Sequence, residues 1–150
     1  MRRWMTGALA GLVACTAPAT EQAEPPAEGS SPDADGPPLV SSLSVQVRDD
    51  DVQFRFQITN GTGAALTLSF PTAQRVDFAV EDSTGAEVWR WSEGKAFART
   101  AGDERLDSAS TRTWEGSWDG GRRRGSFTAT ARLTSSSHPL DLRTRFALEE

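Results

Sequence analysis

Cysteine and histidine, two residue types common in catalytic and metal sites, are scarce in this 150-residue sequence, which has only Cys15 and His138. A single cysteine excludes an intramolecular disulfide framework, and neither residue type is numerous enough for a zinc site of several cysteines or histidines. A nucleophile–histidine–acid site would need His138, which precedes Pro139 in a serine-rich turn without an orienting acid. We therefore predict no catalytic residue, no cofactor and no metal site, and hence a protein that is not an enzyme.

The run Asp49-Asp50-Asp51 offers the clustered carboxylate oxygens that Ca²⁺ prefers. No spaced series of further oxygen ligands follows it, and the run stands between two segments of alternating apolar residues. The sequence favours a solvated hairpin turn at this point over a calcium site.

The first fifteen residues are typical of an export signal. A basic start is followed by an uncharged run over residues 4–14, which is too short for a membrane helix of about 20 residues. The run ends in Leu12-Val13-Ala14-Cys15, which resembles the bacterial lipobox. This resemblance implies removal of residues 1–14 and lipidation of Cys15, which would then anchor the chain in a membrane. The alternative is a plain secretory signal with an incidental cysteine.

The charge of the processed chain limits its partners. Removal of residues 1–14 takes away two of the 16 basic residues and none of the 21 acidic ones, which leaves a net charge of −7. Nucleic acid is an unsuitable partner for such a chain, since phosphate binding requires a basic surface. We expect an extracytoplasmic protein, periplasmic or on the cell surface, that contacts the membrane through its lipid.

Residues 15–38 form the next segment. Positions 16–38 hold six of the eight prolines, five acidic residues and no basic residue. Such a composition buries too little apolar surface to offset the entropy of ordering the chain. We predict a disordered tether over residues 15–38 and a folded domain over residues 39–150.

From Leu39 onward, apolar and polar residues alternate with a period of two, as in half-buried antiparallel strands. Turn-forming residues separate the runs about every ten residues, and no stretch of twelve has a helical period. This pattern predicts an all-β fold, an immunoglobulin-like antiparallel β-sandwich of eight or nine strands. The expected strands lie near residues 43–47, 52–58, 66–70, 76–80, 87–91, 110–118, 126–133 and 143–148.

Several segments of this domain resemble the intracellular proteinase inhibitor (BsuPI) family. The most specific is Val88-Trp89-Arg90-Trp91-Ser92 behind a turn glycine, and residues 56–60 and 74–78 also fit the family pattern. The similarity covers about residues 45–133, with departures such as Val76 in place of an aromatic residue and Arg99 in place of glutamine. The resemblance implies an immunoglobulin-like domain whose founding activity is inhibition of a serine protease, and it supplies no catalytic residue.

The tryptophans allow two interpretations. Trp89 and Trp91 share one face of a strand, as do Trp114 and Trp118, so each pair either fills the core or forms an exposed platform for a sugar or a peptide. Asp77 is expected to face solvent, where it would bind Arg75, Arg99 or a backbone amide. On the face opposite the tryptophans, Arg90 is expected to pair with an acid.

Two loops are the candidate partner-binding segments. Residues 92–105 carry Lys95, Phe97 and Arg99, and residues 120–125 carry Arg122, Arg123 and Arg124 between glycines. Long loops on a rigid sandwich often bind partners. The first segment is alternatively a connection between sheets with Phe97 folded inward, and the second a solvated hairpin tip that prevents edge aggregation.

Three functions fit these observations. The first is a lipid-anchored binding domain of the proteinase-inhibitor type, with a serine protease as partner. The second is a non-inhibitory interaction or assembly lipoprotein, with another protein of the cell envelope as partner. The third is a carbohydrate-binding module that uses exposed tryptophans.

Overall fold

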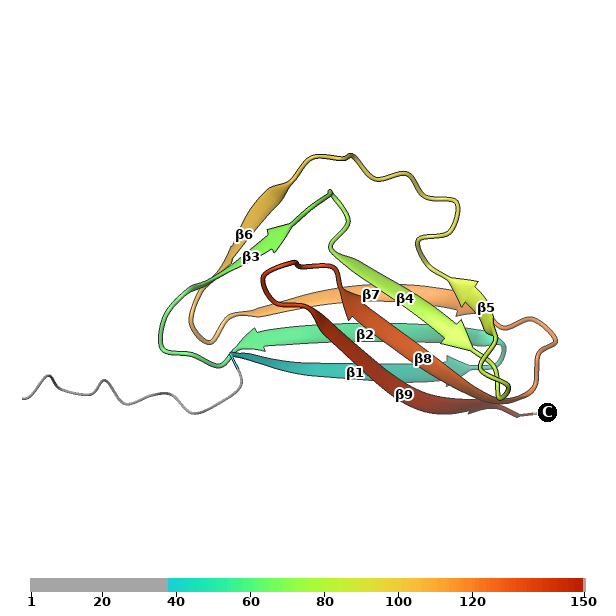
Figure 1. The fold of residues 1–150 in the computed structure, drawn as a ribbon. Coiled ribbons are helices and arrows are strands. Elements are labelled where there is room, and N and C mark those ends of the chain that lie inside the picture. The colour runs from blue at the N-terminus through green and yellow to red at the C-terminus, as the bar shows by residue number, and fades with distance from the viewer. Residues whose placement is uncertain (1–37, 150) are drawn as a thin grey trace, which may run out of the picture. The chain divides into compact units, whose positions relative to one another are not determined.

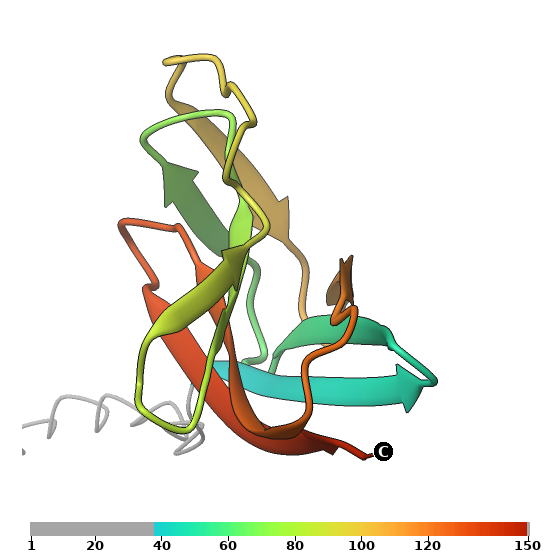
Figure 2. The same ribbon diagram turned by 90° about the vertical axis from the view of Figure 1, so that its right-hand side faces the viewer.

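Nine β-strands make up the part of the chain that the computed structural model describes, residues 38–149, and no helix occurs among these residues. All strand pairs are antiparallel, and the strands form an all-β, sandwich-like fold (Figures 1 and 2). The predicted fold class is therefore confirmed. Cys15, the export signal and all of the predicted tether except Pro38 lie outside the described residues, so lipidation, export and disorder there stay predictions.

The strands belong to three sheets. The first has the order β1-β2-β7, the second pairs β3 with β6, and the third has the order β5-β4-β8-β9. The strand bounds are β1 (Leu39–Arg48), β2 (Asp51–Asn60), β3 (Leu66–Phe70), β4 (Val76–Glu81), β5 (Glu87–Arg90), β6 (Gly102–Leu106), β7 (Thr111–Asp119), β8 (Gly125–Leu133) and β9 (Leu140–Leu148).

The core lies between the first and third sheets and is extended by Leu68, Phe70 and Leu106 of the second sheet. The alternating burial in β2 shows how one sheet contributes to it. The side chains of this strand alternate strictly, so that Phe54, Phe56 and Ile58 are buried while Gln53 and Arg55 are exposed. Each large apolar side chain buried in this way contributes about 1.5–3 kcal/mol to folding. The facing sheet supplies buried apolar residues from β4, β8 and β9, and the rings of Phe54 and Phe78 stack with centroids 5.9 Å apart.

Strand β4 is buried on both faces, unlike β2. One face of β4 points into the core through Val76, Phe78 and Val80. The other face carries Asp77 and Ala79, which are also buried, at 7% exposure each. A strand that is covered on both sides indicates that other residues pack over its outer surface.

Strand β6 was missed by the sequence pattern, which placed residues 102–105 in a loop. This strand exposes Asp103 and Arg105 and buries a single large apolar residue, Leu106. With one apolar residue among charged ones, no alternation of apolar and polar residues can be recognised in its sequence. The connection that follows β5 is thus shorter than predicted and ends before Gly102. It joins the third sheet to the second, as the crossing alternative predicted.

Candidate functional site

The segment between β5 and β6, residues 92–101, is named here the crossing loop. It lies at the end of the sandwich formed by β3, β6 and the β3–β4 connection, which is uppermost in both views (Figures 1 and 2). Ser92 and Phe97 are half-buried, and the other side chains of the loop are exposed. The loop therefore presents most of its length to solvent.

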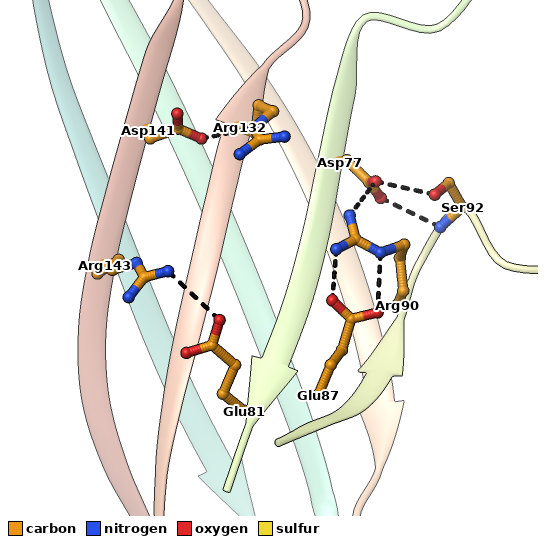
Figure 3. Close-up of polar contacts among 8 residues, drawn as sticks. All are labelled: Asp77, Glu81, Glu87, Arg90, Ser92, Arg132, Asp141 and Arg143. Atoms are coloured by element: carbon orange, nitrogen blue, oxygen red, sulfur yellow. Dashed lines mark hydrogen bonds and ion pairs between the residues drawn. The ribbon is translucent and has the colours of Figure 1, made fainter. Parts of the chain in front are cut away.

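A buried carboxylate holds the start of this loop. The Ser92 backbone N–H donates to Asp77 Oδ1 (3.1 Å), the Ser92 hydroxyl donates to Asp77 Oδ2 (2.8 Å), and Arg90 Nη1 also donates to Oδ2 (2.9 Å) (Figure 3). Arg90 bonds in addition to Glu87. The hydrogen bonds that Arg90 donates to Glu87 and to Asp77 raise the pKa of Arg90, so its guanidinium stays charged.

The prediction for Asp77 was wrong about exposure and right about one partner type. The side chain is buried, and neither Arg75 nor Arg99 binds it. A backbone amide does, as one of the alternatives stated, and it belongs to Ser92. The prediction that Arg90 pairs with an acid is confirmed.

The β4–β5 hairpin explains how these residues meet. Thr84 donates to Asp82 from both its hydroxyl and its N–H, which lowers the pKa of Asp82 and closes the turn. The register that follows pairs Ala79 with Arg90. Because side chains alternate across strands, the same register brings Asp77 opposite Ser92. The turn signal was visible in the sequence, but the pairing next to the turn, Glu81 with Glu87, would by itself place Asp77 opposite Trp91. A β-bulge between Val80 and Glu81 shifts the register by one residue, and this shift is what brings Asp77 to Ser92.

Trp91 supports the middle of the crossing loop. Its backbone N–H donates to Phe78 O (2.8 Å), and its ring contacts the edge of the Phe78 ring, with centroids 6.5 Å apart. The Phe97 ring packs on Trp91 at 6.0 Å, and the Lys95 ammonium lies 3.4 Å from the centroid of a Trp91 ring as a cation–π contact. The structure thus brings Lys95 and Phe97 together on one tryptophan, with Phe97 folded inward.

Space for this arrangement depends on Gly116 in β7. A Cβ atom added there would lie 2.9 Å from a Phe78 ring atom and 3.4 Å from a Trp91 ring atom. A larger residue would therefore push on both rings that support the loop. This role of Gly116 is not visible in the sequence, because the neighbouring rings come from other strands.

Arg99 lies apart from this aromatic cluster. The carbonyl of the preceding residue, Ala98, accepts a hydrogen bond from the Ala73 N–H (2.9 Å) in the β3–β4 connection. The Arg99 side chain is exposed, and within residues 38–149 it forms no ion pair. The three residues predicted for this loop consequently divide into two that hold it and one that projects from it.

The second predicted segment, residues 120–125, connects β7 and β8. Arg124 forms an ion pair with Asp50 (3.0 Å), and the Gly120 N–H donates to Asp50 O (2.8 Å). The acidic run is thus the β1–β2 hairpin turn, as predicted, and it adjoins the arginine run. Arg122 and Arg123 are exposed and form no ion pair among the described residues.

The other three tryptophans of residues 38–149 pack against the core rather than forming a platform. Trp118 is 5% exposed, Trp89 stacks on Phe54 (5.5 Å), and Trp114 stacks on Phe56 (5.8 Å). These contacts match the core interpretation of the two pairs.

A groove of about 550 Å³ runs along the first sheet. Its lining includes Trp91 and side chains of alternating positions on β1, β2 and β7. The polar lining residues are Ser44, Gln46, Gln53, Arg55, Glu115 and Ser117, of which Arg55 and Glu115 form an exposed ion pair.

The described residues offer no assembled catalytic or metal centre. His138 Nδ1 lies 3.0 Å from the neighbouring Ser137 hydroxyl, which also accepts the Ser69 N–H, and no acid bonds to the ring. No group of three or more acidic, histidine or cysteine side chains is placed to hold a metal ion over residues 38–149. In the same range, no helix has the length and apolarity to cross a membrane.

The fold defines the class of this protein as an all-β, sandwich-like domain with a supported, exposed crossing loop. Residues 39–138 match the model of the family described as "BsuPI: Intracellular proteinase inhibitor". The match covers two thirds of the chain, and the chain belongs to this family, which is a family of inhibitors and not of enzymes. No curated protein matches the chain significantly.

Solved structures show only distant likeness. β-Glucosidase 3B from Thermotoga neapolitana, in complex with glucose, has 14% identity and a TM-score of 0.42, over 75% of this chain and 16% of that one. A penta-heme cytochrome c552 from Thermochromatium tepidum has 12% identity and a TM-score of 0.43, over 73% and 39%. The alkylpurine DNA glycosylase AlkC from Pseudomonas fluorescens, bound to DNA, has 15% identity and a TM-score of 0.42, over 77% and 31%. The chain spans less than two fifths of each of these proteins.

Proposed function

We propose that this chain is a lipid-anchored, extracytoplasmic inhibitor of a serine protease, and that the crossing loop is the segment that enters the protease cleft. The membership of the inhibitor family supports a protease as partner. The lipobox-like run that ends in Cys15 supports export and anchoring. The target of an exported chain would be a protease outside the cytoplasm.

The observation that carries the proposal is the support under the crossing loop. Asp77 binds its first residue, Trp91 holds Lys95 and Phe97, and Ala73 binds the carbonyl of Ala98. An inhibitor loses affinity when a mobile loop must become ordered on binding, and a loop that is already held avoids much of this cost. The residues left exposed on such a loop are suited to a narrow protease cleft.

Inhibition is tested with the chain produced without residues 1–14 and with Cys15→Ala, against trypsin, chymotrypsin, elastase and subtilisin. We expect nanomolar inhibition of at least one protease. Replacement of residues 93–100 by a glycine–serine linker of equal length should abolish it. The matched control, the same replacement of residues 121–124, should preserve it. Inhibition of no serine protease, or loss only in the control, would contradict the proposal.

Anchoring is tested separately in the full chain. Cys15→Ala should move the protein from the membrane fraction to the soluble fraction, because the lipid would no longer be attached. A Ser30→Ala chain serves as the control, since Ser30 lies in the predicted tether and away from the lipobox-like run. A Cys15→Ala chain that still sediments entirely with membranes would exclude the lipoprotein interpretation.

The groove along β1, β2 and β7 favours a non-inhibitory interaction lipoprotein as the second candidate. The amide, hydroxyl and charged side chains that line this groove offer both hydrogen-bond donors and acceptors to a partner. Under this alternative, Gln53→Ala and Ser117→Ala would weaken binding to an envelope protein, whereas the linker in the crossing loop would leave that binding unchanged.

A further inference from the structure

We infer that Arg99 is the specificity-determining residue of the crossing loop, and that the protease it fits cleaves after basic residues. This inference rests on the proposed function and names the class of its target. It follows from the difference between Arg99 and the other cations near the loop. Lys95 lies over the ring of Trp91, Arg90 is bound by Asp77 and Glu87, and Arg75 is bound by Glu104.

The backbone around Arg99 is held on both sides. The ring of Phe97 packs on Trp91, and the Ala98 carbonyl accepts the Ala73 N–H. On the other side the chain enters β6 at Gly102, which pairs with Phe70 of β3. Residues 99–101 therefore form a short exposed span between two fixed points.

The conformation of this span suits a protease cleft. Residues 95–101 contain no turn and no positive φ angle. The N–H and C=O groups of residues 99–101 make no backbone hydrogen bond to another described residue. These groups are therefore free to bond with a strand edge of the protease. Extended peptides bind exposed strand edges through main-chain groups of this kind. Ala98, Thr100 and Ala101 are small and leave the approach open.

The guanidinium determines which pocket would accept this span. A long cationic side chain that enters a specificity pocket needs a carboxylate at its base, and arginine forms a two-pronged, charge-assisted contact with such a group. A small or purely apolar pocket would leave the charge buried without a partner, which is strongly unfavourable. Arg99 thus favours a trypsin-like pocket over an elastase-like one.

Arg122 and Arg123 are the competing cations, and their setting is less suitable. Gly120, Gly121 and Gly125 surround them, and Gly121 and Gly125 have positive φ angles of 56° and 109°. A turn with left-handed residues on each side bends the chain instead of extending it. These two arginines provide matched controls, since they are exposed like Arg99.

The test measures inhibition constants of the Cys15→Ala chain and its variants against trypsin and chymotrypsin. Arg99→Ala should raise the constant for trypsin at least 100-fold, Arg99→Lys less than tenfold, and Arg122→Ala less than twofold. Arg99→Leu should weaken inhibition of trypsin and strengthen that of chymotrypsin. Since Arg99 is exposed, equal urea midpoints for all variants are expected and show that the fold is intact.

Two outcomes would overturn the inference, and they differ in what else they affect. If Arg99→Ala leaves inhibition unchanged while the linker in residues 93–100 abolishes it, Arg99 is not the specificity residue and the proposed function stands. If the parent chain inhibits neither trypsin nor any other protease, the inference and the proposed function both fail.

Discussion

The crossing loop and the β7–β8 connection are both exposed and both rich in cations, yet they are held in different ways. The first is fixed by a buried carboxylate, a tryptophan and a backbone hydrogen bond to the β3–β4 connection. The second depends on the exposed Arg124–Asp50 ion pair and on hydrogen bonds at its start. The number of arginines therefore says little about which loop is ready to bind.

What separates the two loops is where their contacts are buried. The Asp77 side chain is only 10% exposed, although its partner Arg90 is 38% exposed, so loss of the hydrogen bonds to Asp77 would leave a buried charge without partners. The partners Arg124 and Asp50 are 37% and 49% exposed, so solvent competes with their ion pair. Substitutions at the two loops should accordingly differ in effect, and four of them test this comparison.

The largest effect is expected for Trp91→Ala. This change removes the ring that contacts Phe78, Phe97 and Lys95, and we expect it to lower the free energy of unfolding by about 3–4 kcal/mol, the lower part of the range for a large aromatic side chain because Trp91 is only half-buried. Urea denaturation measures it, with Arg123→Ala as a control that should change little. Equal midpoints for both variants would mean that Trp91 does not support the crossing loop.

Asp77→Ala should rank second. It removes the acceptor of three hydrogen bonds from Ser92 and Arg90, and the expected loss is about 2–3 kcal/mol because Arg90 keeps Glu87 as a partner. Asp103→Ala, an exposed change in β6, is the control. Amide hydrogen exchange should also show faster exchange at Ser92 in the variant. Unchanged exchange at this amide would argue against the anchoring role of Asp77.

Gly116→Ala tests the support of the crossing loop from β7, where Gly116 faces the rings of Phe78 and Trp91. The added methyl group would meet the Phe78 ring at 2.9 Å, and we expect a loss of about 1–2 kcal/mol through overpacking. Gly63→Ala is the matched control, since nothing lies within 4 Å of its Cβ position and its φ angle is ordinary. Thermal unfolding distinguishes the two. A Gly116→Ala protein as stable as the control would show that the two rings move aside freely.

The smallest effect is expected for Arg124→Ala in the β7–β8 connection. Exposed ion pairs contribute at most about 1 kcal/mol, and salt screens them. The difference in stability from the parent chain should shrink as sodium chloride is raised from low to high concentration. Arg122→Ala, which breaks no ion pair within the described residues, provides the baseline. A salt-independent loss above 2 kcal/mol would indicate that this connection is as firmly held as the crossing loop.

Most of the β-sandwich follows from local patterns in the sequence. Alternation of more buried and more exposed positions is strong enough to place β2, β3, β8 and β9. Strand β4 is buried on both faces, and it is placed by the apolar residues at its inward positions. The Asp49-Asp50-Asp51 turn was also correctly predicted, since three adjacent carboxylates disfavour a buried strand. Strand β6 was missed because its outward charges outnumber its single buried leucine.

Less of the candidate site than of the fold could be predicted from the sequence. Sequence alone determined which residues are present: the Val88-Trp89-Arg90-Trp91-Ser92 segment, the cations of both loops, and the absence of a second cysteine or histidine. Only the tertiary structure decided that Asp77 is buried and bonded to Ser92, that Lys95 and Phe97 lie on Trp91 while Arg99 projects, and that Asp50 holds Arg124. The physical reason is that the contacts of Asp77 and Asp50 join residues of different strands or turns, whereas those of Lys95 and Phe97 depend on the path that the chain takes after Trp91. Their geometry is set by strand register and by which sheet packs on which, and neither is written in the local pattern of one segment.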